Sequence, residues 1–220
     1  APLTTIKGLG EKAIEQIINH RPFNTVEEFL FHEEISYSKL NKKCLDVLIR
    51  SEAMTCLMDD RFTGLKHFWS SVAVERPRKE KDLDDNIVSY APEGDFSIEE
   101  KIEYLTSLTG VFPMGLVVDE EIRQRLNDYC VPAISDYDPD LNLVWFIPRK
   151  VTSRKTKNGK TYWVVEVIDE NNVLTHIKCW GIKEGKDNIH LNRPYMAKLD
   201  HSEQWGFSSR SIRHNFRMLG

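Results

Sequence analysis

The sequence predicts an α+β chain with a helical module in its N-terminal part and a small five-stranded β-barrel at its C-terminal end. Two observations support this prediction. Apolar residues recur every three or four positions in the first part, and the period changes to two after Leu143. At 220 residues, 40 % of them hydrophobic, the chain can form two small cores. We expect a helical module over 1–75, a linker over 76–95, a helical connecting segment over 96–142 and the barrel over 143–220.

The segment TIKGLGEKAI, from Thr5 to Ile14, has the composition of a phosphate-binding hairpin. Glycines adopt positive φ readily, so that successive amide N–H groups can turn outward into a concave nest. The helix that follows adds its own unpaired N–H groups and the positive end of its dipole. This arrangement is typical of a helix–hairpin–helix contact with a DNA backbone. The alternative is a glycine-rich helix start with a structural role only. The predicted backbone-binding residues are Lys7, Gly8, Leu9, Gly10 and Lys12, with the Leu9 side chain buried beneath the turn.

Charge divides the chain into an acidic body and a basic end. Residues 149–220 hold 14 Lys and Arg against 7 Asp and Glu, a net charge of +7. The remaining 16 basic and 27 acidic residues give residues 1–148 a net charge of −11. A basic module of this size indicates a polyanionic partner, most simply nucleic acid.

Other classes of protein are disfavoured by what the sequence lacks. It has no long apolar run and no signal-peptide pattern, so we expect no membrane partner and a cytoplasmic location. The four cysteines are isolated, which indicates reduced thiols, most of them in the core. The histidines are not at metal-ligand spacing, and no nucleophile–base pair is evident. We therefore expect no metal site, no catalytic residues and no cofactor.

Helices are predicted wherever the apolar spacing is three or four. After the first helix, Asn24 or Thr25 can cap a second one. Further helices are expected over about 39–51, 60–72 and 119–129, and the aromatics of 60–72 are expected in the core. Ser97 and Glu100 have the spacing of a capping box, which predicts another helix start. Prolines and mixed charge favour a linker or long surface loop over 76–95.

Strands are predicted over about 143–152, 161–168, 175–180, 194–203 and 208–218, with a short helix over 182–188. Asn158-Gly159 predicts a two-residue type I′ turn between the first two strands. Five strands with a helix after the third are the sequence order of an OB-fold barrel, which binds oligonucleotides across its second and third strands.

Alternation assigns Trp163, Val165, Val167, Ile177 and Cys179 to the barrel interior. The opposite face and its basic hairpin are expected to bind a single strand, with aromatic stacking on bases. For Trp180, a place in the core under the following helix is the alternative. The predicted single-strand-binding residues are Arg154, Lys155, Lys157, Lys160, Tyr162, His176, Lys178 and Trp180.

Three stretches resemble, in order, one protein family. TIKGLGEKAIEQIINHR, PFNTVEEFL and LNKKCLDVLIRSEAMTCL are similar to the segments IKGVGxxAVxxIIxxR, pFxSlxDFl and lNKRxLExLIkaGAFDsL. These follow the fingers in the alpha subunit of bacterial family C replicative DNA polymerases (DNA polymerase III alpha). VTSRKTKNGKTYWVVEVIDENN resembles the TKKGkxMAFvtLEDxtG stretch of the same family's OB domain. Glu52 and Asn172 stand where that family has glycine, and no Gln-led clamp-binding peptide is evident.

The resemblance implies a non-catalytic C-terminal segment of a bacterial or phage polymerase, because the metal-binding carboxylates of that family lie far upstream. We expect the chain to be part of a longer polypeptide, with the hairpin module on duplex DNA and the barrel on single-stranded template. The rest of the polymerase and replisome proteins are the implied protein partners. Two alternatives stay open: a stand-alone replication or repair accessory protein, and an OB-fold module that docks a replisome protein.

Overall fold

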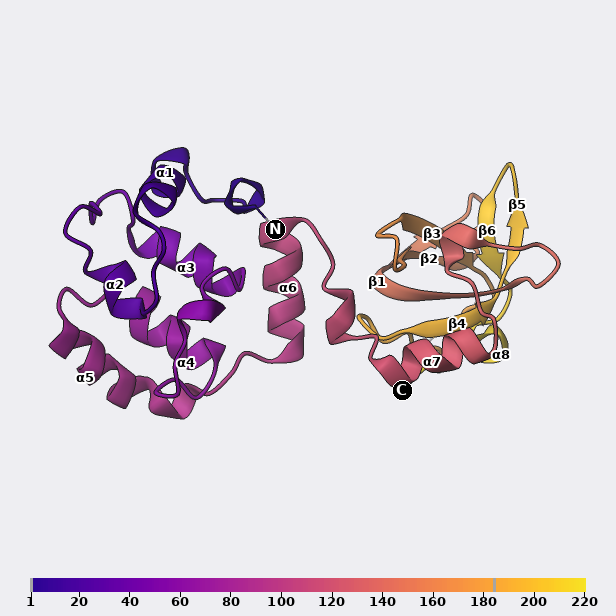
Figure 1. Cartoon of the computed structure of the whole chain (residues 1–220). Coiled ribbons are helices and arrows are strands. Elements are labelled where there is room, and N and C mark those ends of the chain that lie inside the picture. The colour runs from indigo at the N-terminus through magenta and orange to yellow at the C-terminus, as the bar shows by residue number, and fades with distance from the viewer. Residues whose placement is uncertain (1, 184) are drawn as a thin grey trace. The chain divides into compact units, whose positions relative to one another are not determined.

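The chain divides into two compact units, Ala1–Pro113 and Met114–Gly220. The computed structural model describes residues 2–183 and 185–220. The first unit is helical and the second is built on a β-sheet, as the α+β prediction requires (Figure 1).

Short helices and connections build the first unit. Its elements are η1 (Leu3–Thr5), α1 (Glu11–His20), α2 (Val26–Leu30), α3 (Lys42–Arg50), η2 (Thr55–Leu57), α4 (Leu65–Trp69), the π-helical turn η3 (Ser70–Val74), α5 (Glu80–Tyr90), η4 (Ala91–Glu93) and α6 (Ile98–Thr109).

Side-chain caps fix where several of these helices begin. The Thr25 side chain accepts a hydrogen bond from the Glu28 amide and so caps α2. Asn41 caps α3 in the same way. At α6, Ser97 and Glu100 form the predicted capping box. Each cap satisfies an amide that the helix itself leaves unpaired.

A hydrophobic core runs through the described part of the first unit. Helix α3 buries Leu45, Leu48 and Ile49. Phe62 and Phe68 pack edge to face with their ring centroids 4.7 Å apart. Both rings are buried, so these aromatics are core residues, as predicted.

The expected linker over 76–95 is wrong for most of its length, because α5 and η4 occupy residues 80–93. Leu83 of α5 is completely buried in the core of this unit. The Asn86 side chain donates hydrogen bonds to the carbonyls of Ser71 (2.9 Å) and Glu75 (2.7 Å). One buried leucine among charged residues gives too weak a periodic signal to identify a helix from sequence.

The expected connecting segment over 96–142 is also divided. Phe96 belongs to the core of the first unit and Ile102 of α6 is buried there, whereas α7 (Glu120–Asp128) lies in the second unit. Within the described residues, no helix is long and apolar enough to cross a membrane.

The second unit contains one curled sheet, together with η5 (Met114–Leu116), α7, η6 (Ile134–Asp136) and α8 (Ile212–Asn215). The strands are β1 (Leu143–Lys155), β2 (Thr161–Ile168), β3 (Leu174–Cys179), β4 (Tyr195–Lys198), β5 (Asp200–Ser202), β6 (Gly206–Ser209) and β7 (Phe216–Met218). Their order is β5-β6-β3-β2-β1-β4-β7, and only the β3–β6 pair is parallel among the described strands.

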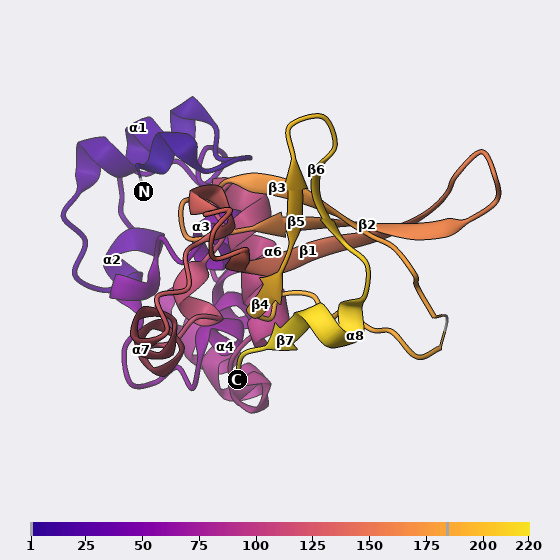
Figure 2. The same cartoon turned by 90° about the vertical axis from the view of Figure 1, so that its right-hand side faces the viewer.

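Strand β1 is long enough to pair with two strands. Its first residues, Leu143–Phe146, pair with β4. From Ile147 onward it pairs with β2, with an irregularity in the register between Pro148 and Lys150. The far parts of β1 and β2 extend beyond the other strands as a projecting hairpin (Figure 2).

Among the described residues, seven strands replace the five expected ones. The expected strand over 194–203 is divided into β4 and β5, and the one over 208–218 is interrupted by α8. The described residues of 181–190 contain no helix, so the predicted helix over 182–188 is wrong there. Few apolar residues in this stretch could hold a helix against the sheet.

The turn of the projecting hairpin also differs from the prediction. Gly159 has φ +77°, but Asn158 is not among the residues with positive φ. The Gly159 amide donates to the Thr156 carbonyl (3.0 Å), and the Thr156 amide to the Lys160 carbonyl (2.9 Å). This pattern fits a three-residue loop with one glycine in the left-handed region, not a type I′ turn.

Alternation correctly identified the interior of the sheet. Val165, Val167, Ile177 and Cys179 are completely buried, and Trp163 is partly buried against the same core. Burial raises the pKa of the Cys179 thiol to about 12, so this thiol stays protonated at neutral pH. All four cysteines are free, but only Cys44 and Cys179 are buried.

We predict that Leu83→Ala destabilises the helical unit, because it leaves a cavity in a core that α5 closes. The free energy of unfolding should fall by about 2–5 kcal/mol. Urea unfolding of the full chain, followed by far-ultraviolet circular dichroism, measures this decrease.

Val88→Ala is the matched control, since Val88 lies on the same helix with 78 % of its surface exposed. Its effect should stay within about 0.5 kcal/mol. Equal effects of the two substitutions would mean that residues 76–95 behave as a linker after all.

Candidate nucleic-acid interface

The predicted hairpin forms a tight turn from Ile6 to Leu9. The Leu9 amide donates to the Ile6 carbonyl (3.3 Å), and Gly8 adopts φ +89°. A side chain is strained at this φ, so the turn requires glycine at position 8. A Cβ on Gly8 would lie 3.5 Å from the Val47 side chain, which is ordinary contact. The backbone conformation, and not crowding, therefore selects glycine here.

The apolar side chains of the turn anchor it to the core. Ile6 and Leu9 are buried, as predicted for Leu9. The Lys7 amide donates to the Leu108 carbonyl on α6 (2.8 Å), which fixes the incoming chain. The turn is thus held from below while its other face stays open.

Gly10 differs from the expectation of a nest made by successive left-handed residues. It is the N-cap of α1, with extended φ −77° and ψ 152°. A Cβ there would meet no atom within 4 Å. The expected concave row of amides therefore comes from one left-handed glycine followed directly by a helix start.

Four backbone amides near the start of α1 have no hydrogen-bond acceptor within the described residues and can donate to a ligand. Within the described part of the chain, no backbone acceptor takes the N–H of Gly8, Gly10, Glu11 or Lys12. Helix α1 has ten residues, so its N-terminal dipole adds to these donors. Amide donors at a helix start form an anion-binding arrangement.

A concavity of about 510 Å³ lies at this site. The hairpin and first turn of α1 form one wall, and the approach to α3 forms the other. Its lining residues are Gly8, Gly10, Lys12, Ala13, Ser38, Lys39, Asn41, Lys43 and Cys44. Lys12, Lys39 and Lys43, together with the open amides, give the concavity a positive potential.

Sequence reasoning missed Lys39 and Lys43 and included Lys7, which does not line the concavity. Lys42 does not line it either, because its Nζ donates to the Val74 carbonyl (2.8 Å). The sequence of Lys39–Lys43 could have indicated this wall, since lysines flank Asn41, the N-cap of α3.

On the β-sheet, the two predicted stacking residues contact each other. The rings of Tyr162 and Trp180 are stacked, with centroids 4.6 Å apart and planes inclined by 23°. Both side chains are half-buried. Trp180 therefore lies beside Tyr162, and the alternative place under a following helix is not found, because the described residues of 181–190 contain no helix.

Charged residues continue the same face. Glu166 pairs with His176 across β2 and β3, and their side chains approach to 3.6 Å. Lys178 donates to the Trp205 carbonyl (3.1 Å), and its Nζ lies 5.2 Å from the centre of the Trp205 ring. Acidic and basic groups thus alternate here, and His176 has an acidic neighbour.

Trp205 is the residue of this face that sequence reasoning missed. It lies in the turn between β5 and β6, with 64 % of its surface exposed. A tryptophan exposed to this extent beside a lysine is suited to stacking on a flat ligand. Its position next to a turn glycine, Gly206, could have indicated from the sequence that this tryptophan is exposed.

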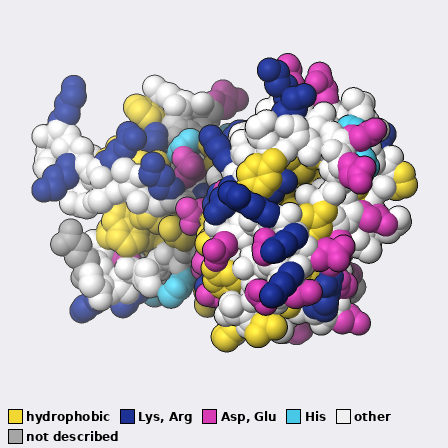
Figure 3. Space-filling model, turned by 90° about the vertical axis from the view of Figure 1, so that its left-hand side faces the viewer, with side chains coloured by type: hydrophobic (Ala, Val, Ile, Leu, Met, Phe, Trp, Pro, Cys, Tyr) yellow, Lys and Arg dark blue, Asp and Glu magenta, His cyan; other side chains and the backbone are white. Residues whose placement is uncertain are grey.

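The projecting hairpin carries the four predicted cations. Arg154, Lys155, Lys157 and Lys160 are all exposed, and none forms an ion pair with a described residue. Figure 3 shows Lys and Arg side chains gathered along this arm. Unpaired cations on a projecting arm can reach a polyanion without first breaking internal contacts.

Comparison with known proteins gives a match in the N-terminal part of the chain. The family model described as "Helix-hairpin-helix motif" matches residues 1–64, which include the turn, α1, α2 and α3. No curated protein matches the chain. The N-terminal part of this chain therefore contains a helix–hairpin–helix module, a motif that indicates nucleic-acid binding.

Proposed function

We propose that this chain is a DNA-binding, non-catalytic C-terminal segment of a family C replicative polymerase alpha subunit. In this role the helix–hairpin–helix module holds the backbone of duplex DNA, and the β-sheet unit binds single-stranded template. The grip uses amides and lysines and needs no cofactor. The remainder of the polymerase and replisome proteins would be its protein partners, in the cytoplasm.

The observation that carries DNA binding is the concavity at the hairpin. Gly8, Gly10 and Lys12 line it, and their open amides can each donate to a phosphate oxygen. Lys39 and Lys43 approach the same space from the start of α3. Such contacts position a protein on the backbone and carry no information about base sequence.

Backbone geometry supports the link to the polymerase family. Glu52 and Asn172 stand where that family has glycine, and both adopt positive φ, +62° and +57°. Few non-glycine residues adopt this conformation. The two departures in sequence are therefore compatible with the same local backbone that glycine gives in the family.

Strand pairing supports the OB-fold interpretation of the second unit. Only Leu199 separates β4, which pairs with β1, from β5, which pairs with β6. If β4 and β5 are counted as one bent strand, the strand pairs form a closed ring. In this ring β1 pairs with β2, β2 with β3, β3 with β6, and the bent strand with both β6 and β1. Five strands connected in this way support the interpretation as an OB barrel, with β7 as an addition.

A second candidate function is protein docking by the β-sheet unit. A concavity of about 720 Å³ lies beside α7, β4 and β7, and its lining includes the apolar side chains of Leu126, Tyr129, Met196 and Met218. Tyr129 is 76 % exposed there. An exposed apolar patch favours a protein partner over a nucleic acid.

Duplex binding should depend on the open face of the hairpin. We predict that Gly10→Ala weakens it without unfolding the module, because the extended φ accepts alanine and the new methyl group occupies the space of the phosphate. Gly115→Ala is the matched control, since its Cβ also meets nothing within 4 Å. Fluorescence anisotropy with two unrelated duplexes measures both variants, and the decrease in affinity should be equal for the two sequences.

The lysines of the concavity provide a second measure of the same site. Lys12→Ala, Lys39→Ala and Lys43→Ala should each reduce the slope of log K against log salt by about 0.9 for every phosphate that is no longer neutralised. Lys42→Ala changes the same charge next to Lys43, but its ammonium group contacts Val74, so the slope should stay unchanged. Slopes that fall equally in all four variants would indicate a diffuse charge effect and no defined site.

Single-strand binding by the second unit has a different signature. Lys155→Ala, Lys157→Ala and Lys160→Ala should each reduce the salt slope for oligo-dT by about 0.7 for every phosphate that the variant leaves unneutralised. Trp205→Ala should instead cost about 1–3 kcal/mol with little change of slope, because stacking releases no counterions. Lys198→Ala, an exposed lysine on β4, is the control. Parental binding by every variant would favour the docking function.

A further inference from the structure

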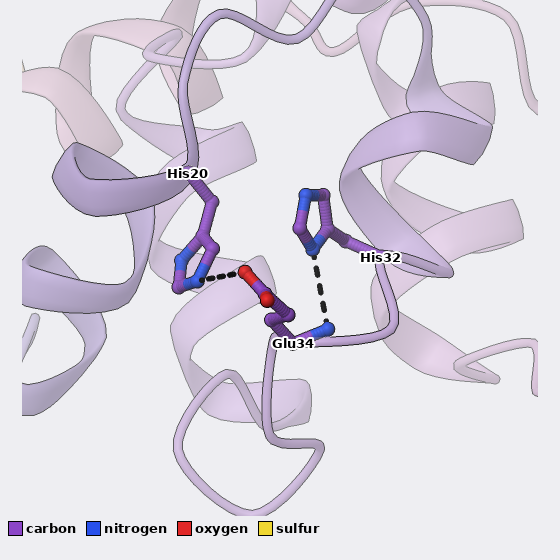
Figure 4. A group of neighbouring side chains, drawn as sticks. All are labelled: His20, His32 and Glu34. Carbon is purple, nitrogen blue, oxygen red and sulfur yellow. Dashed lines mark hydrogen bonds and ion pairs between the residues drawn. The ribbon is translucent and has the colours of Figure 1, made fainter.

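Three potential metal ligands meet at the end of α1 opposite the hairpin. His20 is the last residue of α1, and His32 and Glu34 lie just beyond α2. Each offers one ligand atom, and these atoms lie within 4.8 Å of one another. Figure 4 shows the Glu34 carboxylate reaching towards His20, with the His32 ring on its other side. Both histidines are half-buried, and Glu34 is exposed.

The backbone of α1 orients the His20 ring. Its Nδ1 lies 2.7 Å from the Gln16 carbonyl oxygen. A carbonyl only accepts, so Nδ1 must carry the proton and, in the neutral ring, Nε2 keeps its lone pair. Metal-binding histidines are commonly held by this kind of second hydrogen bond. The Nε2 atom lies 3.3 Å from a carboxylate oxygen of Glu34.

The His32 ring presents Nδ1 on the side of Glu34. That atom accepts a long hydrogen bond, 3.3 Å, from the Glu34 amide. A bond of this length is weak, so a metal ion could replace it at little cost. The two imidazole rings lie edge to face with their centroids 4.9 Å apart, so both rings reach the Glu34 side chain.

We propose that His20 Nε2, His32 Nδ1 and the Glu34 carboxylate bind a divalent transition-metal ion, with zinc as the best fit. Zinc bonds of about 2.0–2.1 Å in a tetrahedron place neighbouring ligand atoms about 3.3–3.4 Å apart. The His20–Glu34 distance already has this value. Only His32 has to move closer, and water completes the fourth position. Imidazole and carboxylate ligands suit zinc better than calcium or magnesium.

Such an ion would tie the segment between α2 and α3 to α1. A hydrogen bond already connects these two parts, since the Ser36 amide donates to the Gln16 side chain (3.1 Å). The same segment continues to Ser38, Lys39 and Asn41, which line the concavity at the hairpin. The ion would therefore order the lysine-bearing wall of that concavity from a distance, as a structural site without chemistry of its own.

Metal titration of the full chain tests the proposal. Cys56→Ser and Cys130→Ser are introduced first, because these two exposed thiols could bind zinc themselves. Calorimetric titration with zinc chloride should then show one equivalent bound. His20→Ala and His32→Ala should each weaken binding by at least about 10-fold, since even a change in a residue that only hydrogen-bonds a metal ligand can have an effect of this size. With cobalt(II), the parent should give a tetrahedral visible spectrum without a thiolate charge-transfer band.

His214→Ala is the matched control, since His214 is exposed on α8 in the other unit, and it should bind zinc like the parent. Circular dichroism checks that each variant is folded. If His20→Ala or His32→Ala is not folded, His32→Gln is measured in its place. One equivalent bound equally well by the His20 and His32 variants would overturn the site. Failure of the parent to bind one equivalent would overturn it too, whatever the result with DNA.

Discussion

The burial of Ile6 and Leu9 is the constraint on which the hairpin site depends. With these side chains in the core, the backbone between and after them must turn sharply, and only Gly8 permits the required φ of +89°. The turn then delivers the chain directly into α1, whose first amides cannot pair within the helix. Apolar burial on one side therefore produces a row of open donors on the other.

The two candidate DNA sites use different physics. At the hairpin, donors belong to the backbone and are fixed by the fold, so side-chain substitutions there chiefly change charge. On the β-sheet unit, the cations Lys155, Lys157 and Lys160 stand on a projecting arm and the aromatic Trp205 on a separate turn. The first arrangement suits a regular phosphate backbone, and the second suits a flexible strand with accessible bases.

The proposed metal site lies at the opposite end of α1 from those open amides. One helix thus links the end that carries the open amides to His20, whose ring is held by the helix carbonyl of Gln16. The wall bearing Lys39 is connected to both ends through the segment after α2. The stability of that segment is the quantity through which metal and DNA binding would be coupled.

The sequence by itself determined the features that depend on neighbouring residues. These include the hairpin with buried Leu9, the capping box at Ser97 and the alternating interior of β2 and β3, because turns, caps and side-chain alternation are local. Only the tertiary structure decided what depends on distant contacts. It placed α5 in the core through Leu83, brought Lys39 and Lys43 to the hairpin, stacked Tyr162 on Trp180 and joined His20 to His32 and Glu34. Residues far apart along the chain meet through the packing of whole elements, which no local pattern encodes.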